Sequence, residues 1–451
     1  MKSIAIKTGV LVVFSLLGAC DGFLDERPNK NIVIPNQLDD LQALMDASNW
    51  GIHNSPEINL LSGDELVATS NAYLVYRLDE QEAYKWSESF FENRSSDWST
   101  PYVQVFYANV VLEEITKIEV ESNEELIKKH EITGSSLFLR ANAFYNLLSQ
   151  FAPAYQPGIN DNALGIPLRL TANINSTADR SDLKTCYNKV IEDLLLALPL
   201  LRDTNAYKSR PSKTAVHALL ARIYLATEQY GKALEHADKA LDMQSTLMDY
   251  NTINASLRFP VPQFNEEVVY HNHMSSYIFN ALTTTVVNPE IYESYEENDL
   301  RRDVFFLINA FGAVFKGTYS GTNSIFSGLA TNELYLIKAE CEARVGNPQV
   351  GLDVLNNLLE TRWANGTYEE KTAQGEGILD LILEERKKEL LYRGQRWSDL
   401  RRLNRDPRYA KTLRRTVQGE EYVLEPNSNR YTLPIPMDEI NNSGIAQNDR
   451  S

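Results

Sequence analysis

The chain has 451 residues and carries 61 Asp and Glu against 44 Lys and Arg, a formal net charge of −17 at pH 7. This acidic excess argues against nucleic acid or an anionic lipid surface as a charge-matched partner. The length exceeds the roughly 100–200 residues of one ordinary domain, although a helical array can reach it as a single unit. The 23 tyrosines suit helix packing and ligand stacking, because each combines a flat apolar face with a polar tip.

The N-terminus predicts export and lipidation. Two lysines precede an apolar run at residues 9–17, which is too short to span a bilayer and is followed by small residues. Residues 17–20 then match the lipobox of bacterial lipoproteins, in which the cysteine is acylated and becomes the first mature residue. We expect residues 1–19 to be a signal peptide, Cys20 to carry the acyl chains of a stable membrane anchor, and residues 20–35 to form a tether.

The next hundred residues mix order and irregularity. A short helix is predicted at residues 38–45, where apolar side chains recur at helical spacing. Residues 51–100 show no sustained period and mix aromatic, acidic and loop-forming side chains. Such a segment in a compact protein is usually functional or disordered, and this one is too aromatic for disorder. We assign Trp86 and Trp98 to structural roles and expect Trp98 to stand just ahead of a helix.

Helical order resumes at Tyr102. Apolar stripes predict one helix from there to about Ile115 and a second over residues 125–151, so the two form a predicted hairpin. Helical spacing returns over residues 183–194, after a stretch broken by prolines.

Residues 212–241 fit the spacing of a tetratricopeptide repeat, with the turn between its two helices at residues 228–231. Small residues fall where the second helix crosses the first, which lets the two backbones approach closely. Residues 335–358 fit the same template less well, and Gly351 stands in the slot that Ala233 fills in the first copy. One such pair cannot bury its apolar face alone, so further stacked pairs are expected.

The segment between the two repeats, residues 246–329, is again irregular, with strand-like pieces at 267–270 and 313–319. Cys186 and Cys341 both lie in helical patterns, where a free cysteine usually behaves as a small buried hydrophobe. A disulfide between them has no support from their spacing.

Together these features resemble the SusD/RagB family of outer-membrane nutrient-binding lipoproteins. The lipobox is followed by an acidic Phe-Leu-Asp segment at residues 23–25, and the matches then run over nearly the full length in the family's order. The most specific block comprises Glu385, Arg386, Glu389, Leu390, Gly394, Arg396, Asp399, Leu400 and Arg402. The remaining matches are Trp98, Tyr102, Phe106 and Asn109, and residues 138–141, 210–213, 334–342 and 434–436. The chain departs from the family's Asn-Pro-Gly-Tyr ending, because Asp449 and Arg450 follow Asn448.

The resemblance implies a mainly α fold of four tetratricopeptide-like helical pairs, in a single domain over residues 36–451. Helical pairs are expected at about 102–245 and 330–403, with loop-rich ligand-side segments at about 51–100 and 246–329. Proteins of this family sit on the outer membrane at the cell surface and close like a lid over a SusC-like TonB-dependent transporter. They capture oligosaccharides or, in some members, peptides, and they catalyse nothing, so the resemblance implies no cofactor.

Binding a neutral sugar requires flat aromatic faces against its C–H surface and a few directional polar groups for its hydroxyls. Both irregular segments offer such side chains. The candidate ligand-binding residues are Asp64, Tyr73, Tyr76, Arg77, Tyr277, Tyr319 and Asn323. None of these positions matches a fixed family motif, and for each the alternative is a side chain packed beneath a loop or an ordinary solvated polar residue.

Two pairs of residues suggest other chemistry. His271 and His273 would share one face of a strand as half a metal site, but no third ligand stands at a recognisable spacing, so no metal is predicted. Glu384 and Glu385 could suggest a glycosidase pair, yet adjacent helical residues point in different directions. We expect instead a structural ion-pair network with the nearby basic residues Arg386, Lys388, Arg396 and Arg402.

The leading hypothesis is therefore a lipid-anchored surface protein that binds an oligosaccharide and delivers it to a transporter. A peptide-binding member of the same family is one alternative, and a tetratricopeptide scaffold that holds a protein partner is another. A glycosidase is the least supported, because the sequence contains no candidate carboxylate pair and no GxSxG, Walker-type or HExxH motif.

Overall fold

The computed structural model describes residues 35–47, 51–89, 91 and 95–451. The predicted signal peptide, Cys20 and the tether up to residue 34 lie outside these residues. Within the described part of the chain, no helix combines the length and the apolar composition that crossing a bilayer requires. The fold is mainly α-helical, as the sequence predicts, and the described strands form two-stranded sheets.

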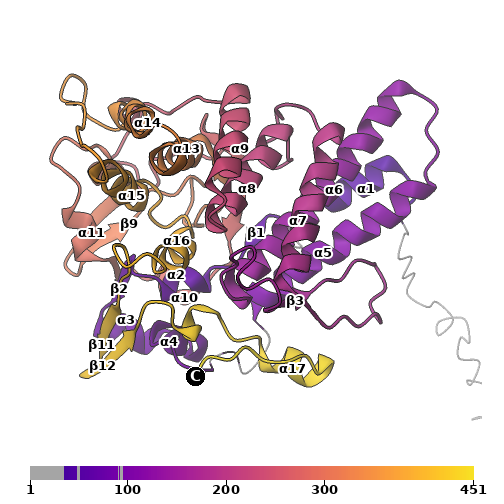
Figure 1. Ribbon diagram of the computed structural model, residues 1–451, viewed down its shortest axis with the longest axis horizontal. Coiled ribbons are helices and arrows are strands. Elements are labelled where there is room, and N and C mark those ends of the chain that lie inside the picture. Colours follow the sequence, from indigo (N-terminus) through magenta and orange to yellow (C-terminus); the bar gives the residue numbers. More distant parts are fainter. Residues whose placement is uncertain (1–34, 48–50, 90, 92–94) are drawn as a thin grey trace, which may run out of the picture.

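Long helices form a row that crosses the molecule from right to left in Figure 1. The first half of the row contains α1 (Leu38–Met45), α5 (Ser96–Glu114), α6 (Asn123–Phe151) and α7 (Leu183–Ala197). The second half contains α8 (Lys213–Ala226), α9 (Tyr230–Met243), α13 (Thr331–Val345), α14 (Pro348–Glu360) and α15 (Gly377–Glu389), and α16 (Arg396–Leu403) lies near the centre. Helices that follow each other pack as pairs, α5 on α6, α8 on α9 and α13 on α14. Both predicted repeats are thus confirmed as helical pairs.

The sequence supplies the starts of several of these helices. The Ser122 hydroxyl accepts a hydrogen bond from Glu125 N, and the Glu125 carboxylate accepts one from Ser122 N, which is a capping box at the start of α6. Ser212 caps α8 and Asp182 caps α7 in the simpler way, by accepting from the N–H three residues further on.

Buried ion pairs join one helical pair to the next. Arg140 of α6 binds Asp193 of α7 through two hydrogen bonds of 2.7 and 2.8 Å. Arg222 of α8 binds Glu333 of α13 in the same bidentate way, at 2.7 and 2.6 Å. Because both partners of each pair are largely buried, these contacts fix the relative position of neighbouring helices.

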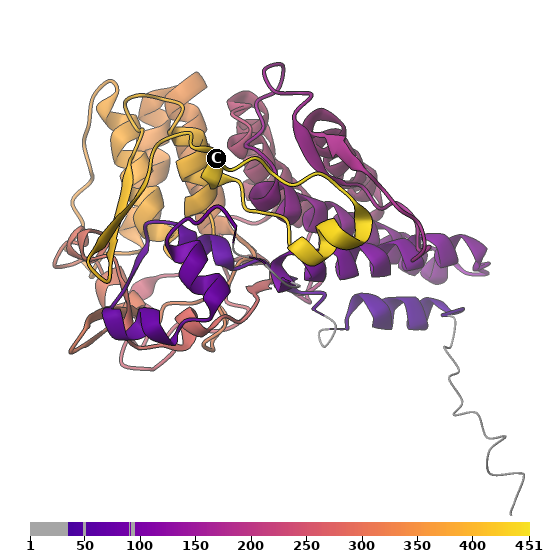
Figure 2. The same cartoon turned by 90° about the horizontal axis from the view of Figure 1, so that it is seen from below.

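A layer of short elements lies beneath the helix row in Figure 1 and comes forward in Figure 2. Its N-terminal part comprises β1 (Asn54–Ser55), α2 (Ile58–Ser62), β2 (Leu66–Ala68), α3 (Ser70–Val75) and α4 (Leu78–Tyr84). Its middle part comprises β5 (Val268–Tyr270), β6 (His273–Met274), α10 (Ile278–Ala281), β7 (Thr285–Val287), α11 (Pro289–Glu293), α12 (Arg301–Phe305), β8 (Phe306–Asn309), β9 (Gly312–Phe315) and β10 (Leu329–Ala330). The C-terminal strands β11 (Leu413–Val417) and β12 (Glu420–Leu424), the helix α17 (Met437–Ser443), and the earlier strands β3 (Leu164–Pro167) and β4 (Arg180–Asp182) complete it.

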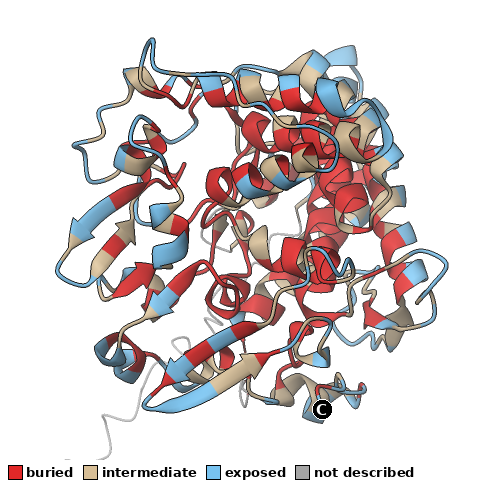
Figure 3. Cartoon of the chain, turned by 60° about the vertical axis from the view of Figure 1, so that its left-hand side comes forward, coloured by how far each residue is buried: buried red, intermediate tan, exposed pale blue. Residues whose placement is uncertain are grey.

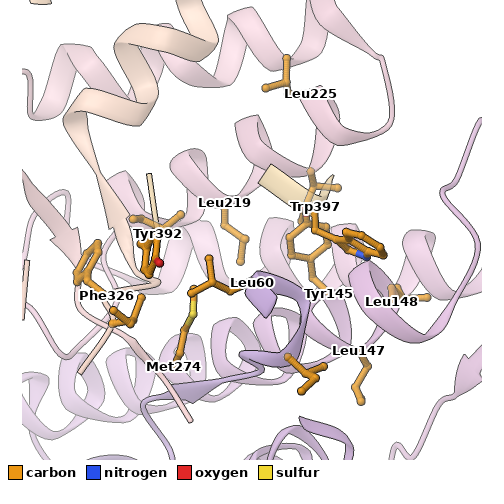
Figure 4. Close-up of a cluster of buried hydrophobic side chains, with 14 of the residues drawn as sticks. Leu60, Tyr145, Leu147, Leu148, Leu219, Leu225, Met274, Phe326, Tyr392 and Trp397 are labelled. Atoms are coloured by element: carbon orange, nitrogen blue, oxygen red, sulfur yellow. The ribbon is translucent and has the colours of Figure 1, made fainter. Parts of the chain in front are cut away.

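The buried apolar residues of the described chain form three clusters, and the one with the most residues joins the two layers. Figure 4 shows Leu60 of α2, Tyr145 of α6, Leu219 of α8, Met274 of β6 and Trp397 of α16 in one buried cluster. Buried residues concentrate on the helices in Figure 3, whereas exposed residues lie on outer hairpins and turns. The irregular segments therefore pack against the helix row through buried side chains.

Three sequence predictions need correction. Residues 51–100 are not irregular throughout, because their described part contains short helices and strands that are too brief to show a period. Trp98 does not precede a helix but lies in the first turns of α5, where it is 4% exposed and packs edge-on against Phe151 at 5.0 Å between ring centroids. The strand expected at 313–319 ends at Phe315. Cys186 and Cys341 are free and buried, as predicted.

The packing of the second repeat makes Gly351→Ala a sharp test of close helix approach. A Cβ atom at Gly351 would lie 2.6 Å from Ala339 O and 3.2 Å from Ala343 N, both backbone atoms of α13. Alanine favours a helix over glycine by about 1 kcal/mol, but the clash is with backbone that moves only if α13 and α14 separate. We expect Gly351→Ala to lower the free energy of unfolding by about 1–3 kcal/mol, as measured by urea denaturation.

Gly231 in α9 provides the matched control. A Cβ atom there would meet nothing within 4 Å. Gly231→Ala should therefore leave stability unchanged or raise it by up to about 1 kcal/mol. Equal stability of the two variants would mean that α13 and α14 do not approach as closely as described.

Candidate functional site

The candidate ligand residue Asp64 lies in a buried ion pair. Arg396 donates to its two carboxylate oxygens at 2.7 and 2.8 Å, and Lys411 approaches one of them at 3.0 Å. Burial alone would raise the pKa of the Asp64 carboxyl, but these two cations hold it well below its usual value. Asp64 thus ties the N-terminal irregular segment to α16, and a ligand would have to displace a cation to reach it.

The four candidate tyrosines are buried. Their side chains are between 2% and 5% exposed, and the residues are Tyr73, Tyr76, Tyr277 and Tyr319. The Tyr76 hydroxyl shares a 2.7 Å hydrogen bond with Thr285, and the Tyr319 hydroxyl donates to Glu267 at 2.6 Å. Burial raises the pKa of both phenols. In this conformation the four rings pack beneath the surface and offer no open face to a sugar.

Arg77 and Asn323 are the two candidates at the surface. The Arg77 side chain is 45% exposed, and its guanidinium carbon lies 4.5 Å from the centre of the Tyr277 ring. The structure therefore brings these two predicted residues together, as a cation–π pair whose arginine faces solvent. Asn323 is exposed, and its carbonyl accepts a hydrogen bond from Asn280 at 3.5 Å.

The two irregular segments meet along several backbone pairings. Strand β1 pairs with β6 and β2 with β7, so each sheet takes one strand from each segment. Residue 284 extends this contact, since Thr284 O accepts from Thr69 N. Segments about 200 residues apart in the sequence thus form one surface, as the sequence analysis proposes for the ligand side.

This surface exposes an unusual number of large apolar side chains. Seven of them are between 38% and 62% exposed, on β2, α3, α4 and the β8–β9 hairpin: Val67, Leu74, Val75, Leu78, Leu307, Ile308 and Phe311. We call these residues, with Arg77 and Asn323, the loop face. Exposed large apolar side chains that gather on neighbouring elements often mark a binding region.

Buried acids lie under the loop face. Asp97 is fully buried and caps α2, because its carboxylate accepts from Ile58 N at 2.8 Å and from Glu57 N at 3.2 Å. Burial raises the pKa of the Asp97 carboxyl to about 7, despite these two N–H donors. Burial also raises the pKa of Glu57, and the neighbouring Asp97 raises it further.

A separate cavity with aromatic walls, which we call the aromatic cavity, has a volume of about 350 Å³. Trp98, Tyr102 and Phe106 of α5 line it, and Arg169 and Glu439 stand at its edge. Trp98 Nε1 and Arg169 Nε are buried and have no hydrogen-bond partner among the described residues. Sequence reasoning missed this cavity, although the four-residue spacing of the three rings along one helix was a usable signal.

The two pairs of residues that suggested a metal site or a glycosidase, His271 with His273 and Glu384 with Glu385, contact other residues of the protein. His271 is 6% exposed and packs against Phe326, and the described residues contain no group of three His, Cys, Asp or Glu able to hold a metal ion. Glu385 is buried against Arg301 at 2.7 Å, whereas Glu384 is exposed beside Lys387. The predicted ion-pair network is confirmed in part, because Lys388 binds Glu385 at 2.7 Å. Arg386 and Arg402 bind Asp399 instead, and Arg396 binds Asp64.

Comparison with known proteins gives matches in both halves of the chain. The profile of a SusD-like family described as starch-binding associating with outer membrane matches residues 22–225. The profile of the SusD family, SusD/RagB, matches residues 330–450.

Individual relatives agree with these profiles. The curated SusD-like protein P2 of Formosa agariphila is 25% identical over 426 residues, which cover 78% of this chain and 80% of that protein. A SusD superfamily protein of Bacteroides thetaiotaomicron superposes with a TM-score of 0.75 at 19% identity, over 92% of this chain and all of that one. A laminarin-binding SusD-like protein superposes with a TM-score of 0.64 at 18% identity, over 91% and 98% of the two chains. At these identities the superpositions show a common fold.

Proposed function

Because the chain belongs to the SusD/RagB family, we propose that it binds an oligosaccharide at the bacterial cell surface and delivers it to a TonB-dependent transporter in the outer membrane. Cys20 would anchor it through its acyl chains, and the helix row would serve as a rigid frame. The starch-binding description of the family and the laminarin-binding relative support a sugar rather than a peptide as the cargo.

The observation that carries this proposal is the loop face. Two segments distant in the sequence are held together by strand pairing, and they present exposed apolar side chains beside Arg77 and Asn323. Apolar and aromatic side chains pack against the C–H faces of sugar rings, while a guanidinium and an amide supply directional bonds to hydroxyls. An open surface of this kind suits an extended chain of sugars, and it is also free to lie against a transporter.

The same geometry supports a binding role without catalysis. Hydrolysis of a glycoside needs two carboxyl groups about 5–10 Å apart across an open cleft. Beneath the loop face Asp64, Glu57, Asp97 and Glu80 are buried, and on it Asp79 is paired with Arg77. The scaffold alternative would place its binding surface on the helix row instead.

Binding measurements on the chain from residue 21 onward test the proposal. We expect at least one oligosaccharide on a glycan array to bind without being cleaved. Calorimetry should then show that Phe311→Ala and Arg77→Ala each weaken binding at least about tenfold, which corresponds to 1.4 kcal/mol. Phe311 is 50% exposed, so Phe311→Ala should change the melting temperature little. Arg77→Ala also removes an ion pair with the buried Glu80, so a small decrease is expected there.

Leu195→Ala on α7 is the matched control, because Leu195 is 48% exposed on the helix row and should not affect binding. Phe106→Ala tests the aromatic cavity by the same measurement. Loss of binding in Phe106→Ala alone would move the sugar site to the aromatic cavity. Release of shorter products from any bound glycan would contradict a purely binding role.

A further inference from the structure

A second cavity, distinct from the loop face, lies where the end of α6 meets the segment after α16 and the C-terminal tail. Its volume is about 500 Å³. Three arginines line it, Arg180, Arg401 and Arg405, and we call it the arginine cavity. The one carboxylate among its lining residues belongs to Asp449, which is exposed at the edge.

Two of the three arginines bind carbonyl and amide oxygens instead of carboxylates. Arg401 is 7% exposed and donates to Ser149 O and Ala152 O at the end of α6. Arg180 donates to backbone carbonyls and, at 2.7 Å, to Asn448 Oδ1. Among the described residues neither has an ion-pair partner, whereas Arg405 is paired with Glu228. The cavity therefore keeps positive charge that no acid neutralises.

This charge is energetically costly and runs against the composition of the chain. Burial lowers the pKa of Arg401 to about 10, and the like charge of Arg405 lowers it as well. Burial also lowers the pKa of Arg180 to about 10. Desolvated cations of this kind gain most from an anion that enters the cavity. The protein has a net charge of −17, so a generally basic surface does not explain why two arginines without a carboxylate partner line one cavity.

The rest of the lining is suited to hydroxyl groups. Seven of its residues are Asn or Gln, whose amides can both donate and accept. Five of these side chains already hydrogen-bond to the protein, while those of Gln156 and Asn429 make no hydrogen bond among the described residues. The one aromatic residue in the lining is Tyr431, which is 4% exposed and packed on Trp397, so it offers little flat surface for stacking. The chemistry of the cavity thus fits a polyhydroxylated anion better than a neutral sugar held by its apolar face.

We propose that the arginine cavity binds the carboxylate or sulfate group of an acidic sugar, so that the cargo is an anionic oligosaccharide. This inference rests on the proposed function, which it narrows to one class of glycan. Guanidinium groups would bind the anionic group through charge-assisted hydrogen bonds, while the amides bind the hydroxyls of the same ring.

The test compares three oligosaccharides of equal length, a uronate, a sulfated galactan and a neutral glucan, by calorimetry on the full-length protein in detergent. We expect one of the two acidic glycans to bind at least tenfold more tightly than the neutral one, and its affinity to fall as salt is raised. Comparison of the uronate with the sulfated glycan shows which anionic group the cavity prefers.

Two isosteric variants place a carboxylate in the cavity without removing an arginine. Gln156 and Asn429 line it, and the structure gives neither side chain a hydrogen bond that the change would break. Gln156→Glu and Asn429→Asp should each weaken binding of the acidic glycan at least fivefold and leave the melting temperature unchanged. Asn365→Asp, the same change at an exposed position beyond α14, should have no effect.

The outcomes separate this inference from the proposed function. Binding of none of the three glycans would count against the proposed function itself. Two results would overturn the anion-binding role of the arginine cavity but not the sugar-binding function. One is binding of the neutral glucan as tightly as the acidic ones, and the other is an affinity for the acidic glycan within twofold of wild type in both variants.

Discussion

Glu389→Gln is expected to lower the free energy of unfolding by about 3–5 kcal/mol, the largest single effect predicted for this chain. Glu389 is 2% exposed and accepts hydrogen bonds from Arg362 at 2.8 and 3.0 Å, from Arg301 at 3.1 Å and from Asn332 at 2.9 Å. Both arginines are fully buried and keep other acids, Arg301 with Asp299 and Glu385 and Arg362 with Glu267. A glutamine offers only one acceptor oxygen, so its NH2 group would face guanidinium N–H groups that water cannot reach.

The position of Glu389 explains why the effect should extend beyond α15. Arg301 belongs to α12 in the loop-rich layer, whereas Arg362 follows α14 in the helix row. Arg362 also binds Glu267 at 2.7 Å, which adds the segment before β5 to the same network. Glu389 therefore joins the two layers electrostatically, just as the cluster in Figure 4 joins them by apolar contact.

Urea denaturation of the Glu389→Gln variant measures this effect, and Glu384→Gln provides the control. Glu384 lies on the same helix, its side chain is 46% exposed, and it pairs with Lys387. Exposed pairs contribute about 0–1 kcal/mol, so the control variant should be close to wild type. Similar losses in both variants would show that the network does not hold the layers together.

The helix row could be predicted from sequence because its signals are local. Apolar periodicity located α6, α7 and both repeats, and Ser122 and Ser212 mark two of the helix starts. Lys388, which binds Glu385, was foreseen as a member of the network around Glu389, but the central members of that network were not. Arg301 and Arg362 come from irregular segments, and no spacing in the sequence shows that they meet at Glu389.

Of the residues on the loop face, only Arg77 and Asn323 were named from the sequence. The aromatic content of residues 51–100 argued against disorder and suggested that tyrosines there stack on a ligand. In the structure Tyr73 and Tyr76 are buried and pack within the protein instead. A tyrosine fits both roles, and in short helices no period distinguishes the inner side from the outer side. The exposed residues there are largely aliphatic, such as Leu74 and Ile308, which carry no chemical signal in a sequence.

The second large effect is a pH-dependent one at Glu65, beneath the loop face. Glu65 is 1% exposed, and its Oε1 accepts a hydrogen bond from Tyr392 N at 2.8 Å. Burial raises the pKa of its carboxyl to about 8, and the nearby charge of Asp64 acts in the same direction. Between the unfolded value of 4.5 and about 8, the folded chain keeps a proton that the unfolded chain releases.

The sign of the effect follows from that proton. A rise in pH through this window favours the unfolded state, so the contribution of Glu65 to stability is greatest below about pH 4.5 and is lost towards pH 8. Glu65→Gln keeps the acceptor for Tyr392 N and removes the titration. Relative to wild type, we expect the variant to gain about 3 kcal/mol of stability between pH 5 and pH 8.

Denaturation of both proteins at several pH values measures this difference directly, and subtracting the two curves cancels the titration of the buried histidines and of the other acids. Glu290→Gln, at an exposed position on α11, should give a difference curve that is flat with pH. A flat curve for Glu65→Gln as well would mean that water reaches Glu65 in solution, and the loop-rich layer would then be less firmly seated on α16 than its buried contacts indicate.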